Sequence, residues 1–195
     1  MLPLRLLQKH FGLKSVVFST YQAVSGSGVK GLQDLQESAL GLPPKFYPYP
    51  IYNNCLPHIG GFKEDGFTSE EHKMINETRK ILELPNLKVS ATCVRVPVMN
   101  CHSVSITVKL KKNFNVEKVK QIFRRGENLV LVDDITQNVY PINSMVDKKN
   151  NVLVGRVRRD LFDKKTLHFW CVADNIRKGA SANGVQILEK ILKNN

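Results

Sequence analysis

The feature that most restricts the fold of this chain is the strict alternation of apolar and polar residues over residues 103–111. The apolar members are Val104, Ile106, Val108 and Leu110. Successive side chains of a strand point to opposite faces of a sheet, so this pattern predicts a strand with one buried face. Residues 88–98 are rich in β-branched side chains and predict a second strand, which residues 99–102 join to the first. A sheet therefore lies at the centre of the fold.

The first eleven residues are apolar and basic and contain no acidic residue, a composition shared with short targeting presequences. However, they have no A-x-A-like cleavage site, and they run directly into residues 14–21, which have the pattern of a buried strand. We therefore expect a helix that leads into a core strand, and not a presequence.

Turn and cap signals indicate two further helices and a loop between them. Three glycines in residues 26–31 mark a turn into the first helix. Thr68 and Glu71 have the spacing of a capping box, and apolar residues then follow at helical intervals until Pro85. Residues 42–62 contain five prolines among aromatic residues, which excludes a regular helix or a central strand there. We predict a long ordered loop.

The rest of the chain mixes both periodicities. Amphipathic helices are predicted around residues 116–123 and 185–192, and strands at residues 129–132, 152–158 and 167–173. Several strands are adjacent in sequence, with helices between groups of them. This order predicts an α+β fold with a mixed, largely antiparallel sheet covered by helices, in a single domain over residues 1–195.

Composition narrows the class of protein. The chain has 195 residues, of which 42% are hydrophobic, and no apolar run approaches the roughly 20 residues that cross a bilayer. The formal net charge of +12 attracts anions, which include nucleic acid, acidic membrane surfaces and phosphorylated or carboxylated metabolites. The basic residues are scattered and lack interleaved aromatics for base stacking, so solvated faces are favoured over a nucleic-acid site.

Several kinds of site have no sequence support. The four cysteines and five histidines have no metal-binding spacing, and the cysteines are expected as reduced thiols. Neither a G-x-G-x-x-G motif after a strand nor a Walker A motif is present, so we expect no dinucleotide-binding fold within these residues.

One group of polar residues stands out, and each member has a structural alternative. Glu70 and Lys73 are i and i+3 on one helical face, the spacing of an exposed ion pair. Arg95 needs an acceptor if its strand is buried, and either a structural carboxylate or a substrate would serve. His102 is either a hydrogen-bonded loop histidine or an acid/base group. Cys101 beside it would suit a thiol nucleophile, but adjacent side chains usually point apart.

Five segments in order along the chain resemble aspartate-β-semialdehyde dehydrogenase. They are residues 18–26, 68–80, 89–98 with His102, 154–160 and 174–180. The resemblance implies reduction of β-aspartyl phosphate to aspartate β-semialdehyde and phosphate with NADPH, in lysine, threonine and methionine biosynthesis. The matched part is the family's second domain, which makes substrate contacts and the dimer interface. A Rossmann domain and the nucleophilic cysteine are expected before Met1, so the isolated chain is expected to be inactive.

The resemblance also implies roles for individual residues. Gln22 matches the glutamine that orients the substrate, and Arg95 the arginine that binds the substrate α-carboxylate. Glu70 matches a residue that accepts from the substrate amine, and Lys73 one that binds phosphate. His102 matches the general acid/base, for which a pKa near neutrality is wanted.

Ser25, Gly26 and Asn175 match cofactor contacts near the nicotinamide. The resemblance implies that NADP(H) is bound mainly by the Rossmann domain. The spacing of the histidines and cysteines gives no reason to expect a metal site. The expected partners are β-aspartyl phosphate, aspartate semialdehyde and phosphate, and further copies of the chain in a homodimer or homotetramer. No nucleic acid or membrane partner is expected, and the expected location is the cytoplasm, or a plastid if the source is eukaryotic.

Two other interpretations stay open. A stand-alone paralogue that acts as a dimerisation or regulatory subunit would also have this sequence, although such a scaffold need not retain Gln22, Glu70, Lys73, Arg95 and His102. The related N-acyl-glutamyl-phosphate reductase shares the architecture, but the spacings from Glu70 to Lys73 and from Arg95 to His102 match the aspartyl enzyme better.

Overall fold

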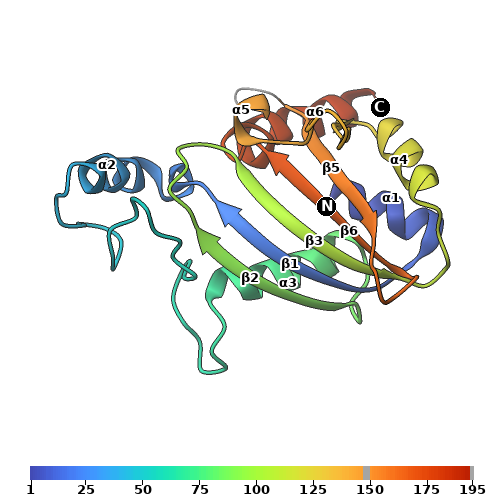
Figure 1. The fold of residues 1–195 in the computed structure, drawn as a ribbon, viewed down its shortest axis with the longest axis horizontal. Coiled ribbons are helices and arrows are strands. Elements are labelled where there is room, and N and C mark those ends of the chain that lie inside the picture. Colours follow the sequence, from blue (N-terminus) through green and yellow to red (C-terminus); the bar gives the residue numbers. More distant parts are fainter. Residues whose placement is uncertain (147–149, 194–195) are drawn as a thin grey trace.

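A six-stranded sheet forms the centre of the computed structural model, which describes residues 1–146 and 150–193 (Figure 1). The strands are β1 (Leu13–Gln22), β2 (Lys88–Arg95), β3 (His102–Leu110), β4 (Leu129–Leu131), β5 (Val152–Arg159) and β6 (Thr166–Ala173). Their order across the sheet is β2-β1-β3-β6-β5-β4. The β1–β2 and β4–β5 pairs are parallel and the other three are antiparallel, which confirms the predicted mixed sheet.

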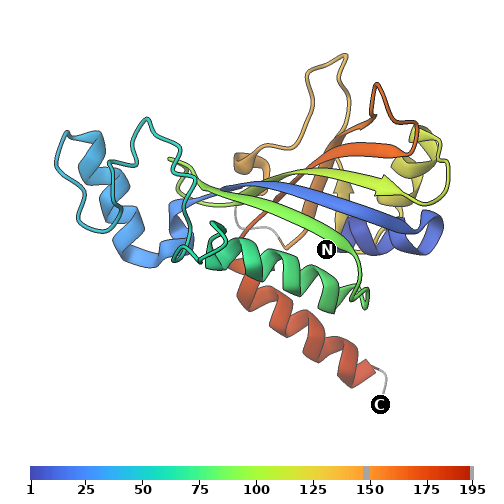
Figure 2. The ribbon, with the colours of Figure 1, turned by 90° about the horizontal axis from the view of Figure 1, so that it is seen from below.

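The helices are α1 (Leu2–Phe11), α2 (Gly28–Ala39), α3 (Ser69–Ile81), α4 (Val116–Arg124), α5 (Asn143–Val146) and α6 (Ala182–Lys193), with a 3-10 turn η1 (Val24–Ser27) and a π-helical turn η2 (Arg177–Ser181). Helices α1, α3 and α4 pack on one face of the sheet (Figure 2). On the opposite face, Val17 and Tyr21 of β1 are exposed. The predicted helices and strands are therefore confirmed, including α1 followed directly by β1.

The pairing of the strands differs from their order along the chain. The segments predicted at residues 88–98 and 103–111 become β2 and β3, and residues 96–101 join them. In the sheet, however, β1 lies between them and pairs with both. Alternation within one segment says which face is buried but contains no information on which strand lies beside it.

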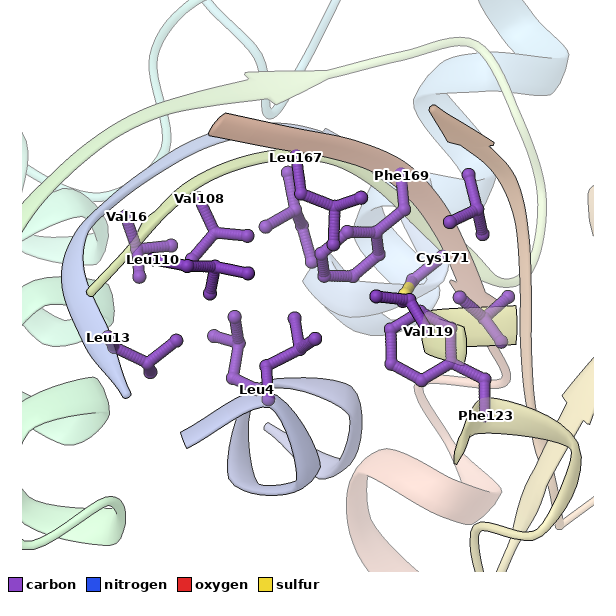
Figure 3. Close-up of a cluster of buried hydrophobic side chains, with 14 of the residues drawn as sticks. Leu4, Leu13, Val16, Val108, Leu110, Val119, Phe123, Leu167, Phe169 and Cys171 are labelled. Carbon is purple, nitrogen blue, oxygen red and sulfur yellow. The ribbon is translucent and has the colours of Figure 1, made fainter. Parts of the chain in front are cut away.

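The main core lies between the sheet and the helices of its covered face (Figure 3). The alternating side chains of β3 point into it, and Leu4 and Leu7 of α1 are fully buried against them. The rings of Phe123 on α4 and Phe169 on β6 are tilted, with centroids 5.5 Å apart. Burial of these side chains is the main driving force that holds the sheet to its helices.

The beginning of α3 is held to the sheet by the predicted capping box. The backbone N–H of Thr68 donates to Glu71 Oε2 at 2.7 Å, and that of Glu71 donates to Thr68 Oγ1 at 3.3 Å. The other oxygen of Glu71 accepts the backbone N–H of Cys93 in β2 at 3.0 Å. Glu71 therefore joins the helix to the sheet, and the preceding residue, Glu70, is placed at the end of β1.

Residues 42–62 contain no regular helix or strand, as predicted, and lie with α2 beyond one end of the sheet (Figure 1). The carboxylate of Asp34 on α2 organises this loop by accepting the backbone N–H groups of Lys45, Phe46 and Tyr47 at 2.8 to 3.0 Å. Ile51 and Leu56 of the loop form a small apolar cluster with Val24 of η1.

Helix α6 forms as predicted, but its apolar side is exposed. It extends away from the sheet in Figure 2. The exposed fractions are at least 54% for Val185, Ile187, Leu188, Ile191 and Leu192. Within the described residues, none of the helices is both long and apolar enough to cross a membrane.

Candidate functional site

The candidate residues meet where several strands end. The parallel strands β1 and β2 end side by side at Gln22 and Arg95, which are register partners. The antiparallel strand β3 begins at the same edge with His102, opposite Ala173 near the end of β6. This edge lies on the side of the sheet from which α2 extends (Figure 1). Residues far apart in sequence are therefore brought together by the topology of the sheet.

Arg95 is 6% exposed, and its Nη1 donates to the carbonyl oxygen of Ala23 at 2.7 Å. Its Nε is buried without a hydrogen-bond partner. Among the described residues, the ion pairs within 4 Å do not include Arg95. Burial lowers the pKa of this guanidinium from its ordinary value. The hydrogen-bond acceptor expected for Arg95 is therefore the backbone carbonyl of Ala23. Because its Nε has no partner, the buried guanidinium can also donate to an anion.

His102 lies beside Arg95. Its Nδ1 accepts the backbone N–H of Ala23 at 3.1 Å, so the proton of the neutral ring is on Nε2. Burial, with a further contribution from the nearby Arg95 charge, lowers the pKa of His102 to about 4. This differs from the pKa near neutrality that we expected, because folding buries the ring next to a cation. A carboxylate bound to Arg95 would offset that charge and raise the pKa of His102.

This shift predicts acid sensitivity. The pKa of His102 is lowered from 6.5 to about 4 in the folded chain, so the unfolded chain binds the proton more readily. The stabilising contribution is present above pH 6.5 and is lost as the pH falls toward 4. Between pH 7 and pH 5 the free energy of unfolding should fall by about 2 kcal/mol more in the parent chain than in His102→Asn, as measured by urea unfolding. His10 is exposed, so the His10→Asn variant should behave as the parent. The same pH dependence in the parent, His102→Asn and His10→Asn would contradict the lowered pKa of His102.

Gln22, Glu70 and Lys73 form the side of the site next to α3. Gln22 Nε2 donates to Glu70 Oε1 at 3.2 Å, and Gln22 Oε1 is buried without a partner. Lys73 Nζ lies 3.7 Å from Glu70 Oε2, and its side chain is 58% exposed. The ion pair expected from the spacing is therefore present, and its carboxylate also contacts the glutamine at the end of β1.

The three residues expected to contact the cofactor, Ser25, Gly26 and Asn175, lie near His102 and the residue before it. Asn175 Nδ2 donates to Ser25 Oγ at 3.1 Å. A Cβ added to Gly26 would lie 2.9 Å from Arg95 Nη1 and 3.3 Å from His102 Nε2. A side chain at position 26 would therefore have to displace the Arg95 guanidinium, apart from any role of Gly26 toward a cofactor.

Two contributors to the site had no signal in the sequence. Ala23 uses its backbone N–H for His102 and its C=O for Arg95, and a backbone role leaves no mark in residue type. Asn143, 41 positions after His102 by sequence number, contacts the turn before that residue.

Two of the four thiols, Cys93 and Cys171, are poorly suited to act as nucleophiles. Cys93, Cys101 and Cys171 are buried, Cys55 is exposed, and all four are free thiols. Burial raises the pKa of Cys93 to about 11 and that of Cys171 to about 12. A nucleophile must be a thiolate, which such values disfavour at neutral pH. Among the described residues, no group of three or more His, Cys, Asp or Glu is arranged to hold a metal ion.

The mixed six-stranded sheet with helices on one face has the fold of the semialdehyde dehydrogenase class. The family sequence model described as semialdehyde dehydrogenase, dimerisation domain, matches residues 4–178. The chain belongs to the aspartate-semialdehyde dehydrogenase family and corresponds to its C-terminal dimerisation domain.

Comparison with individual proteins agrees with this. The chain is 44% identical to the aspartate-semialdehyde dehydrogenase of Campylobacter jejuni, with 97% of this chain and 57% of the relative aligned. The fold matches aspartate semialdehyde dehydrogenase II from Vibrio cholerae, crystallised with ASA, with a TM-score of 0.91, 34% identity, and coverage of 98% of this chain and 58% of that one. The Candida albicans enzyme, crystallised with NADP, has a TM-score of 0.71 and 28% identity, with 98% of this chain and 54% of that one covered. The chain thus spans a little over half the length of these relatives.

Proposed function

We propose that this chain is the substrate-binding and dimerisation part of an NADPH-dependent aspartate-semialdehyde dehydrogenase, which converts β-aspartyl phosphate to aspartate β-semialdehyde and phosphate. The observation that carries the proposal is the buried Arg95, which has a backbone acceptor, an unpartnered Nε and no ion pair within the described residues. A buried guanidinium in this state favours binding of a carboxylate, the group at one end of an amino-acid substrate.

The surrounding residues suit the rest of such a substrate. Glu70 and Lys73 place a negative and a positive charge 3.7 Å apart at the exposed side of the site, which suits a ligand that has both an ammonium and a phosphate group. Gln22 joins this pair to the sheet and has one free buried oxygen. We assign Glu70 to the amine, Lys73 to the phosphate and Gln22 to orientation of the reacting carbonyl.

His102 is assigned as the proton-transfer group. With Nδ1 accepting from Ala23, its Nε2–H is a donor toward the reacting atoms in the neutral ring. Burial and, to a smaller extent, repulsion by Arg95 lower the pKa of His102, and a substrate carboxylate bound to Arg95 would offset the repulsion, so the ring would become a better proton acceptor when substrate is present. Substrate binding and proton transfer are in this way coupled through two adjacent residues.

A nicotinamide nucleotide would contact this chain at Ser25 and Asn175, whose hydroxyl and amide suit its polar groups and lie next to the turn that precedes His102. When bound, NADPH supplies the hydride for reduction. Gly26, which packs closely against Arg95 and His102, is the residue after Ser25. Most of the cofactor and the nucleophilic thiolate are assigned to a second domain of the whole enzyme, and the exposed apolar side of α6 gives this chain a surface that such a domain would cover.

A chimera tests the proposal. In the chimeric enzyme, residues 1–195 replace the matching part of the Campylobacter jejuni relative, and phosphate-dependent reduction of NADP by aspartate semialdehyde is measured. The chimera should be active and the chain alone inactive. Activity of the chain alone would contradict the assignment of the thiolate to another domain. A folded but inactive chimera would contradict the substrate site.

Association with further copies of the chain is the second part of the proposal, as a homodimer or a homotetramer. The supporting observation is the face of the sheet opposite to α1, α3 and α4, on which Val17 of β1 is 47% and Tyr21 37% exposed. Sedimentation equilibrium of the chain should give at least twice the mass of one chain. A monomer at micromolar concentration would contradict this part while leaving the substrate site untouched.

A further inference from the structure

The turn at residues 100–103, which includes the first two residues of β3, has an unusual backbone. Cys101 is fully buried and has a φ of +70°, in the left-handed region that non-glycine residues seldom adopt. Such a conformation is costly and persists only where surrounding contacts hold it. The next residue is His102, so the direction of the imidazole depends on what holds this turn.

Two asparagine side chains from distant parts of the sequence contact the turn. Asn175 Oδ1 accepts the backbone N–H of Cys101 at 3.0 Å. Asn143 Nδ2 donates to the carbonyl oxygens of Cys101, at 2.6 Å, and Asn100, at 3.2 Å. Asn143 Oδ1 in turn accepts from the hydroxyl of Ser103 at 2.8 Å. The amide of Asn143 therefore contacts residues on both sides of His102.

We propose that Asn143 is a positioning residue for His102, because its amide fixes the turn at residues 100–103 so that Nδ1 of the imidazole meets the N–H of Ala23. Both the nitrogen and the oxygen of the Asn143 amide are needed for this. The Nδ2 donor orients two consecutive carbonyls, which sets the left-handed peptide, and the Oδ1 acceptor fixes the first residues of β3 through Ser103. An aspartate in its place would present a carboxylate to those two carbonyls and lose both donors.

The expected effect of Asn143 on catalysis rests on the proposed function, whereas its expected effect on the protonation of the His102 ring does not. If the turn relaxes, His102 loses the Ala23 N–H, the donor that keeps the proton of the neutral ring on Nε2. The fraction with the proton on Nδ1 should rise at least tenfold. In the chimeric enzyme, kcat should fall about tenfold while KM changes less than twofold, because Asn143 is not placed against the substrate.

The test compares variants of the full 195-residue chain with labelled histidine nitrogens. NMR at pH 7 reports the protonated nitrogen of each ring. Asn143→Ala and Asn143→Asp should shift the His102 signals. His168 is held by Thr107 and Asp160 at 2.9 and 2.8 Å and should stay unchanged as an internal reference. The matched control is Ser144→Ala, since Ser144 is exposed and is the next residue of α5.

Ser103→Ala keeps the test decisive if the Asn143 variants do not fold, because it removes one hydrogen bond to the same amide. It should shift the His102 signals in the same direction by a smaller amount. Unchanged His102 signals in the folded variants, or the same shift in Ser144→Ala, would overturn the proposal. So would an Asn143→Ala chimera with the kcat of an active parent chimera. An inactive parent chimera would instead contradict the proposed function, and the ring measurement would still decide the role of Asn143.

Discussion

Arg95→Lys should lower kcat/KM of the chimeric enzyme by about 100-fold. The guanidinium already donates to the Ala23 carbonyl through Nη1, and its remaining N–H groups are available in the planar arrangement that binds a carboxylate at two points. Lysine retains the charge but has one nitrogen for both tasks. Loss of charge-assisted hydrogen bonds worth roughly 3 kcal/mol corresponds to a factor of about 100. Steady-state kinetics with aspartate semialdehyde as the varied substrate measures it.

The matched control for this prediction is Arg79→Lys. Arg79 also donates to a backbone carbonyl, that of Leu87 at 2.9 Å, but it lies near the end of α3 remote from the site. Its replacement should change kcat/KM less than twofold. If Arg95→Lys were equally mild, Arg95 would have no role in substrate binding, and its burial would be a feature of the fold alone.

Phe169→Ala should lower the free energy of unfolding by about 3–5 kcal/mol, the range for removing a buried aromatic ring from a core. Phe169 is 1% exposed and packs against Phe123 between β6 and α4 (Figure 3). Typical domains are stable by about 5–15 kcal/mol, so the loss would be a large part of the total. Urea unfolding measures it through the shift of the midpoint.

Phe162→Ala is the control for the core prediction. Phe162 lies between β5 and β6 and is 96% exposed, so its removal should change the free energy of unfolding by less than about 0.5 kcal/mol. A small effect of Phe169→Ala, similar to that of Phe162→Ala, would show that the covered face of the sheet does not hold the fold together.

The secondary structure of this chain could be predicted well from local patterns. The capping box of Thr68 and Glu71, the alternation in β3 and the helical spacing in α4 each reflect a periodicity or a cap that neighbouring residues determine. The pairing of β2 with β1 could not be predicted in this way. Strand neighbours are chosen by the whole sheet, and β1 separates two strands that are consecutive after α3.

The site was predictable in part. Only the family resemblance assigned functional roles to Arg95, His102 and Glu70, because each residue taken alone also fits a structural role. The contacts among them came from the fold. Ala23 acts through its backbone, and Asn143 reaches the turn from a separate loop, so neither could be found from spacing.

The sequence by itself determined the class of fold, the positions of the helices and strands, and the family, because these depend on local periodicity and on several motifs in order. Tertiary structure alone decided the state of the site. The pKa of His102 is lowered because folding buries the ring beside Arg95, and a side chain at position 26 would displace the Arg95 guanidinium because folding brings that group against Gly26. Electrostatic and steric effects of this kind depend on distances between residues that are far apart in the chain, and only folding sets those distances.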